Sequence, residues 1–374
     1  MADFRKLSFI ILGVGLLLIT LLLVLMYFKY PSMDFEIYCS AVEVLDDGND
    51  PYVLSNLQDK MDWNMPYRYA PITLPFFKVM CLTSHYVPWF IFLILAFFII
   101  KSSDKGFKPF LYLVITFTGF VAVFKSFSIG NTGVIDLFFF SMILYFILKK
   151  NYEMSAIIIG FLSIFKIFPI VFIGLFFFVN KSLWERIKIM LLGISTFILL
   201  HLLSLSIYPK ISQTYYYLLF KGYPLVDQIG YNNPSLFSII TKFFSSLNLV
   251  LYGLGIVLIS TLLFYVVYKN KLNFISSFCL GVIAILLVLP ELKPYSFSIA
   301  LIPLYLLIKE KGNYFWYIIV ACALPLLIKV MYSLFKAEIN LIPILKYFCW
   351  YNQYIFLFII FIMLCWGVYV ENKN

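Results

Sequence analysis

The sequence has little charge for its length. Only 12% of its 374 residues are charged, whereas a soluble domain carries about 25%. With 63% hydrophobic residues and a mean hydropathy of +0.98, the chain cannot present an aqueous surface on all sides. This composition excludes an ordinary soluble protein and predicts an all-α polytopic integral membrane protein, surrounded by membrane lipids.

Residues that ligate metals or hold nucleotides are also scarce. The two histidines, His85 and His201, are far apart, and the six cysteines show no C-x-x-C spacing, so we expect no metal site. Cys39 and Cys81 could pair outside the membrane. No G-x-x-x-x-G-K-[ST], G-x-G-x-x-G or Asp-x-Asp pattern occurs, which disfavours nucleotides and nucleotide sugars as substrates. No cofactor is expected.

The excess of positive charge is distributed along the chain. Lys and Arg outnumber Asp and Glu by 28 to 18, but they are scattered among short loops, which disfavours a nucleic-acid partner. Placing the Lys-rich loops in the cytoplasm predicts about 12 transmembrane helices with both termini cytoplasmic. Residues 1–374 then form one membrane-embedded domain, with extracytoplasmic loops at 29–85, 208–248 and 331–352. The apolar run 7–28 is too long for the core of a signal peptide and is interpreted as a signal-anchor.

The segment 34–52 directly follows the first apolar run and is rich in acidic residues. Its apolar residues recur at helical spacing, with Asp34 in the first turn. The sequence Gly48-Asn49-Asp50-Pro51 is typical of a turn that ends a helix. We therefore expect a short amphipathic helix on the membrane surface, with Asp34 at its start, inside the first extracytoplasmic loop.

A second polar feature interrupts the apolar run 154–179, which has Lys166 and Pro169 at its middle. A lysine at the bilayer centre costs about 2.5–3.5 kcal/mol unless it faces a polar cavity. Two short helices that meet at Lys166, in a re-entrant segment or hairpin, would keep the basic residues at both ends of this run on the same side of the membrane. Alternatively, Lys166 simply pairs with an acid.

Several of these motifs occur together in a known family. The run D-F-E-I-Y-x-x-A-x-x-x-L-D-D-G-N-D-P-Y, followed by Tyr67-Arg68-Tyr69-Ala70-Pro71, resembles the opening of glycosyltransferase family 87. These are GT-C type membrane enzymes that include polyprenol-phosphate-mannose-dependent α-1,2-mannosyltransferases. The K-I-F-P sequence at Lys166 resembles the family's K-x-x-P. Asn131 in S-I-G-N and Asn233 in N-P-S-L match G-Q-x-N and N-Q-S-L loosely.

The resemblance implies a GT-C type helical bundle that acts at the extracytoplasmic face of the inner (cytoplasmic) membrane. The donor would be a polyprenyl-phosphate sugar carrying a mannose-like hexose, and the acceptor a glycan or a glycolipid. Asp34 falls where the family's catalytic Asp lies, which implies a general base for an inverting transfer. An acid in the first turn of a helix is also explained by the helix dipole alone.

The expected substrate contacts are charged, amide and tyrosine side chains. In one segment they differ from those of the family. Arg68 suits a phosphate because its guanidinium presents a fixed fork of donors, although interfacial arginines also extend to lipid headgroups. The two asparagines also suit turns. Near residue 290, family members often carry histidines where this chain has Glu291, Lys293 and Tyr295, so the identity of the sugar is not carried over. The full set of expected contacts is Arg68, Tyr69, Asn131, Lys166, Asn233, Glu291, Lys293 and Tyr295.

Two other functions stay open at this point. A transporter or lipid flippase places its site at broken helices in repeated halves. The segment at Lys166 is one such break, but no second, matching break is visible. A ligase or polymerase of surface polysaccharide shares the substrates and the chemistry of a glycosyltransferase, so the sequence does not separate these two.

Overall fold

The computed structural model describes residues 33–61, 65–84, 86–221, 233–309, 315–334 and 343–371. All regular elements of these residues are helices. Five helices are long and apolar enough to cross a membrane, namely Tyr86–Ser103, Pro109–Ile129, Leu183–Ile207, Asn248–Lys269 and Pro343–Trp366. Shorter apolar helices of 10–17 residues accompany them. The all-helical membrane architecture is therefore confirmed, the number of about 12 spans stays a prediction, and the first expected span, 7–28, lies outside the described residues.

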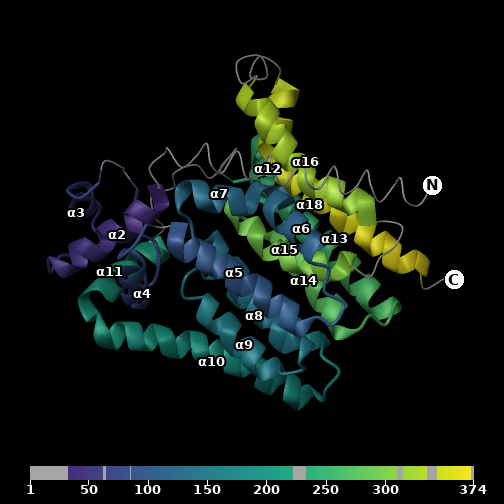
Figure 1. Cartoon of the computed structure of the whole chain (residues 1–374), viewed down its shortest axis with the longest axis horizontal. Helices are drawn as coiled ribbons and strands as arrows, with labels where there is room; N and C mark the ends of the chain where they lie inside the picture. The colour runs from purple at the N-terminus through teal and green to yellow at the C-terminus, as the bar shows by residue number, and fades with distance from the viewer. Residues whose placement is uncertain are drawn as a thin grey trace. The chain divides into compact units, whose positions relative to one another are not determined.

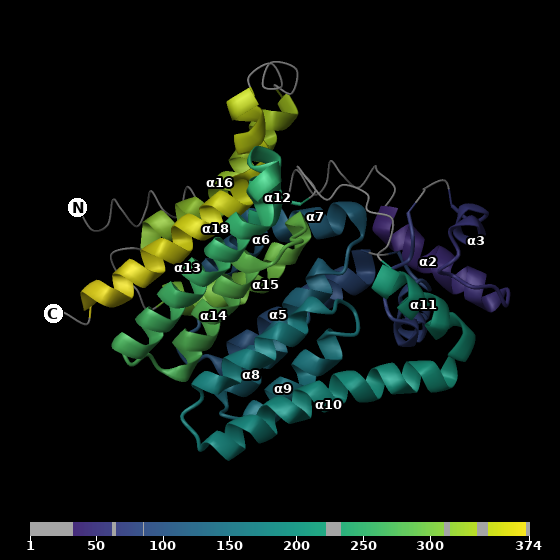
Figure 2. The ribbon, with the colours of Figure 1, turned by 180° about the vertical axis from the view of Figure 1, so that it is seen from behind.

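The helices form two compact units, which we name by number (Figure 1). Unit 2 contains the described residues of 28–105 and 126–226, and unit 1 contains those of 106–125 and 227–374. In unit 2, α5, α8, α9 and α10 run side by side, as Figures 1 and 2 show from opposite sides. In unit 1, α14 packs against α13, α15 and α18, and α16 packs against α18.

Each unit contains α-helices and shorter 3-10 helices, which are labelled η. Unit 2 contains α2 (Met33–Asp46), α3 (Leu54–Gln58), η1 (Pro71–Thr73), α4 (Leu74–Met80), α5 (Tyr86–Ser103), α8 (Gly133–Leu148), α9 (Tyr152–Leu162), η3 (Phe168–Phe178), α10 (Leu183–Ile207) and α11 (Pro209–Lys221). Unit 1 contains α6 (Pro109–Thr118), η2 (Gly119–Val121), α12 (Leu236–Phe243), η4 (Ser245–Leu247), α13 (Asn248–Lys269), α14 (Phe274–Val288), η5 (Pro294–Phe297), α15 (Ser298–Ile308), α16 (Phe315–Leu334) and α18 (Pro343–Glu371). Helix α7 (Ala122–Ile129) begins in unit 1 and ends in unit 2.

Helix α2 ends as the sequence predicts. Gly48 adopts a φ of +77°, a conformation that glycine adopts without steric cost. Its N–H donates to the Leu45 carbonyl at 2.9 Å, and the Asn49 N–H donates to the Val44 carbonyl at 2.9 Å, which together form a Schellman motif. The helix is enclosed more fully than a helix lying alone on a surface, because α3 and α4 pack against it. A disulfide between Cys39 and Cys81 also joins α2 to the end of α4.

The break at Lys166 is confirmed. Helix α9 ends at Leu162 and η3 begins at Phe168. Pro169 lies in the first turn of η3, where a backbone N–H would have no acceptor within the helix, so proline is tolerated there. Whether the two helices form a re-entrant hairpin stays a prediction.

Two polar segments contain helix. Helix α7 continues to Ile129, and its serines Ser126 and Ser128 are buried. Gly130, with a φ of +70°, then ends the helix. In the expected outer loop 331–352, α16 continues to Leu334 and α18 begins at Pro343.

Candidate active site

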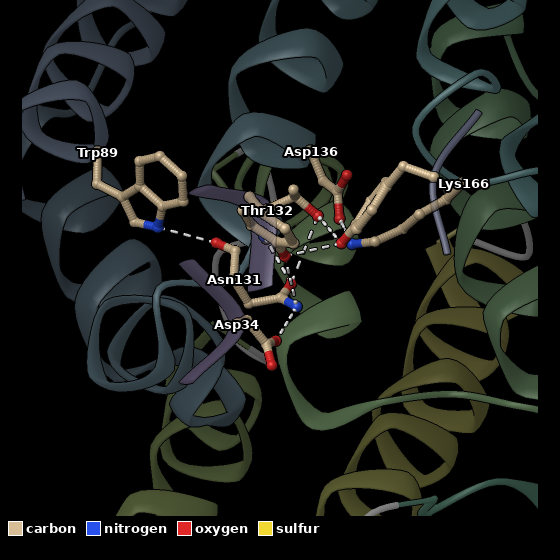
Figure 3. Close-up of polar contacts among 9 residues, drawn as sticks. Asp34, Trp89, Asn131, Thr132, Asp136 and Lys166 are labelled. Atoms are coloured by element: carbon tan, nitrogen blue, oxygen red, sulfur yellow. Dashed lines mark hydrogen bonds and ion pairs between the residues drawn. The ribbon is translucent and has the colours of Figure 1, made fainter. Parts of the chain in front are cut away.

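The carboxylate of Asp34 lies in the first turn of α2, where Asn131 contacts it (Figure 3). The side-chain amide nitrogen of Asn131 donates a hydrogen bond to Asp34 Oδ2. Asn131 is itself firmly oriented, since its Oδ1 accepts the N–H of Gly133 at 3.1 Å and its backbone carbonyl accepts Trp89 Nε1 at 2.8 Å. With its carbonyl end bound to the start of α8, the amide has only its donor end to direct at Asp34. The arrangement orients the carboxylate.

Hydroxyl groups extend this contact to a network. Tyr38 lies one turn after Asp34 on α2, so the two side chains project on the same side of the helix. The Tyr38 hydroxyl lies 2.9 Å from the Tyr69 hydroxyl, which in turn lies 3.2 Å from Thr132 Oγ1. Burial, and to a lesser degree the Asp34 carboxylate, raise the pKa of Tyr69 above its usual value. The phenol of Tyr69 therefore stays protonated at neutral pH and keeps its ability to donate.

A buried ion pair lies beside this network. Lys166 Nζ contacts Asp136 Oδ2, and Asp136 lies one turn after Thr132 on α8. The Asp136 side chain is fully buried and that of Lys166 is 13% exposed. Because an unpaired buried charge is strongly unfavourable, each group explains the presence of the other. The alternative in which Lys166 pairs with an acid is therefore the arrangement that the structure shows.

Asp136, Tyr38 and Thr132 were not singled out from the sequence. Asp136 had a usable signal, because it is an acid inside the apolar run 134–148, and intramembrane acids mark functional or paired positions. The tyrosine and the threonine carry no such signal, since both residue types are ordinary in membrane helices and loops.

Arg68 belongs to the same unit and lies in the segment that carries Tyr69. Its neighbour Tyr67 is fully buried, with its hydroxyl 2.7 Å from Thr73 Oγ1. The backbone carbonyl of Tyr69 accepts a hydrogen bond from the Tyr52 hydroxyl. Arg68, between these two anchored tyrosines, is partly exposed, so its position is determined by the backbone on both sides.

The other expected contacts belong to unit 1. Asn233 Oδ1 accepts the N–H of Leu292 at 2.9 Å, and its Nδ2 donates to the Pro290 carbonyl at 3.3 Å. Glu291 and Lys293 form an ion pair at 3.1 Å. Tyr295 is partly buried in η5. The amide of Asn233 thus organises the backbone that carries Glu291 and Lys293.

In the described part of the chain, no three His, Cys, Asp or Glu residues lie together as metal ligands would. The four cysteines outside the disulfide, Cys279, Cys322, Cys349 and Cys365, are buried thiols.

Comparison with known proteins places this site in context. Residues 65–290 match the model of glycosyltransferase family 87. No curated protein matches the chain. The matched residues include Arg68, Tyr69, Asn131 and Lys166, whereas Asp34 precedes them. Because the match covers more than half of a chain whose helices are those of a membrane protein, the chain belongs to glycosyltransferase family 87 and is a membrane glycosyltransferase.

Proposed function

We propose that the enzyme transfers a hexose from a polyprenyl-phosphate sugar to a hydroxyl group of a glycan or glycolipid, with Asp34 as the general base. The observation that carries this proposal is the hydrogen bond by which Asn131 orients the Asp34 carboxylate. A base has to be directed at the proton that it removes, and an oriented carboxylate in a polar network meets this need. An acid that served only the helix dipole would not require a buried asparagine to hold it.

The reaction needs one base and one stabilised leaving group. The acceptor oxygen attacks the anomeric carbon while Asp34 takes the hydroxyl proton. The bond from the anomeric carbon to the phosphate oxygen breaks, and its electron pair leaves with the polyprenyl phosphate. Attack opposite to the leaving group inverts the configuration, so no second carboxylate is required for a covalent intermediate.

Arg68 is the first candidate for the phosphate of the donor. A planar guanidinium gives two parallel hydrogen bonds to phosphate oxygens, and a positive charge there stabilises the departing phosphate most in the transition state. Lys166 and Lys293 are placed second, because an ammonium group cannot give these two parallel hydrogen bonds. Each of the two lysines also forms an ion pair, with Asp136 and Glu291 respectively. Tyr69 would contribute a protonated hydroxyl beside the base.

The Cys39–Cys81 disulfide supports an extracytoplasmic active site in the inner membrane. Disulfides persist in oxidising compartments and are rare in the cytosol. Since one of the two cysteines lies on α2, the helix that carries Asp34 is expected on the oxidising side.

The test is transfer of labelled hexose from a polyprenyl-phosphate donor by the purified protein. Asp34→Asn keeps the shape of the side chain and removes the base, so the rate should fall by about 10²–10⁴. Glu36→Gln, a matched loss of charge two residues along the same helix, should change the rate little. An Asp34→Asn enzyme with near-normal turnover would end the assignment. A ligase or polymerase would instead move a preassembled oligosaccharide, and a flippase would move the donor lipid without breaking it.

A further inference from the structure

The turn after α2 contains a residue that binds to three segments of the chain. Asp50 Oδ1 accepts the backbone N–H of Tyr52 at 2.9 Å, a contact that aspartate commonly makes with the residue two positions further on. Its Oδ2 accepts the hydroxyl of Thr214 on α11 at 2.6 Å, and its backbone carbonyl accepts Nδ2 of Asn56 on α3 at 2.9 Å. Asp50 therefore fixes this turn to a helix whose contacting residue lies 164 positions further along the chain.

The turn carries Tyr52, which makes separate contacts through its ring and its hydroxyl. Tyr52 is only 4% exposed, and its ring centroid lies 5.5 Å from that of Tyr67 and 5.4 Å from that of Tyr215 on α11. Its hydroxyl donates a hydrogen bond to the backbone carbonyl of Tyr69. Because this bond is made to a peptide group, it fixes the path of the backbone from Tyr67 to Tyr69 and not only the orientation of one side chain.

Arg68 lies at the middle of this backbone segment and is partly exposed. On one side of it the hydroxyl of the fully buried Tyr67 lies 2.7 Å from Thr73 Oγ1, and on the other side Tyr52 binds the Tyr69 carbonyl. A long side chain follows every movement of the backbone that carries it. Misplacement of a catalytic group by about 1 Å can lower a rate by about 10²-fold. The precision with which Arg68 meets a substrate therefore depends on the hydroxyl of Tyr52.

We propose that Tyr52 is a positioning residue for the transfer reaction. It holds Arg68 at the phosphate of the donor by binding the backbone next to it, and Asp50 and Thr214 hold Tyr52 in place. The inference rests on the proposed function, in which the guanidinium of Arg68 contacts this phosphate. Helix α11 thereby supports the site from a distance, through the hydroxyl that Thr214 donates to Asp50.

The experiment is a double-mutant cycle on hexose transfer by the purified full-length protein, with the hexosyl ester of a short prenyl phosphate as donor. The four proteins are the wild type, Tyr52→Phe, Arg68→Gln and the variant with both changes. Tyr52→Phe keeps the ring and removes the hydroxyl, so kcat/KM should fall by about tenfold. Arg68→Gln removes the cation itself and should cost about 10²–10³. In the Arg68→Gln background, Tyr52→Phe should change kcat/KM by less than about twofold, because no guanidinium is left to misplace.

Two further variants on α11 separate positioning from folding. Thr214→Val keeps the shape of the side chain and removes the hydroxyl that Asp50 accepts, so it should lower kcat/KM by a smaller factor, and again only when Arg68 is present. Tyr216→Phe is the matched control. It removes a tyrosine hydroxyl that lies 2.8 Å from His201 Nδ1 on α10, and it should transfer hexose at the wild-type rate. Thermal unfolding shows which of the variants are folded.

The cycle separates this inference from the proposed function. Equal losses for Tyr52→Phe with and without Arg68 mean that the hydroxyl supports only the fold, which overturns the inference, and so does a folded Tyr52→Phe enzyme with the wild-type kcat/KM. If Tyr52→Phe does not fold, the same cycle with Thr214→Val decides. An Asp34→Asn enzyme with near-normal turnover overturns the general base and leaves the cycle intact. A wild-type protein that does not use the prenyl donor overturns the donor class and this inference together.

Discussion

The ion pair between Asp136 and Lys166 gives a sharp prediction for stability. The Asp136 side chain is fully buried and that of Lys166 is 13% exposed. Removing one partner of a buried pair leaves an uncompensated charge and costs about 3–5 kcal/mol. Lys166 retains slight exposure and a flexible chain that can reach more polar surroundings, and an isolated Asp136 can take up a proton. Because both effects reduce the loss, we expect each single variant to lower the free energy of unfolding by about 3 kcal/mol, the lower limit of this range.

The double variant should behave differently from the sum of the two. Asp136→Asn/Lys166→Met has no buried charge, and uncharged replacements of a buried pair are often neutral or stabilising. We expect its free energy of unfolding to lie within about 1 kcal/mol of the wild-type value, whereas independent sites would lose about 6 kcal/mol together. The assay is denaturant titration in detergent micelles, followed by tryptophan fluorescence, for all four proteins.

A double variant that loses as much stability as the two single variants combined would refute this reasoning. The result would mean that the two side chains do not compensate each other's charge. Lys166 would then return as a leading candidate for the donor phosphate.

Four further predictions concern unit 2, which contains the candidate active site. Asn131→Ala should lower kcat more than it raises KM for the acceptor, because it removes the orientation of Asp34, and equal effects on both would argue for direct substrate contact. Replacing Cys39 and Cys81 by serine should destabilise the protein by about 4 kcal/mol, the chain-entropy value for a separation of 42 residues, as measured by thermal unfolding. The raised pKa of Tyr69 keeps its hydroxyl protonated up to at least about pH 10, so Tyr69→Phe should leave any alkaline decline of the pH–rate profile in place. A single cysteine at Asn56 should react with an impermeant thiol reagent from outside the cell, and reaction only from the cytoplasmic side would contradict the proposed topology.

The amino-acid sequence by itself determined the features that depend on local chemistry. Low charge and long apolar runs require a membrane protein, because unpaired backbone groups and charges are unfavourable in lipid. The end of α2 at Gly48 and the break at Lys166 follow from the backbone preferences of glycine and proline, which act over a few residues. The family was recognisable for the same reason, since its motifs are short runs in a fixed order.

Only the tertiary structure decided which side chains meet. Asp34 and Asn131 are 97 residues apart, and Asp136 and Lys166 are 30 apart, so their contacts depend on which faces of the helices pack together. Hydrophobic periodicity gives little guidance there, because helices buried on most sides are apolar all round. The sequence offered Asn131 and Lys166 as separate substrate contacts. In the folded protein Asn131 instead contacts the proposed base, and Lys166 forms an ion pair with Asp136. The physical reason is that polar groups buried by packing are stable only when they pair with one another.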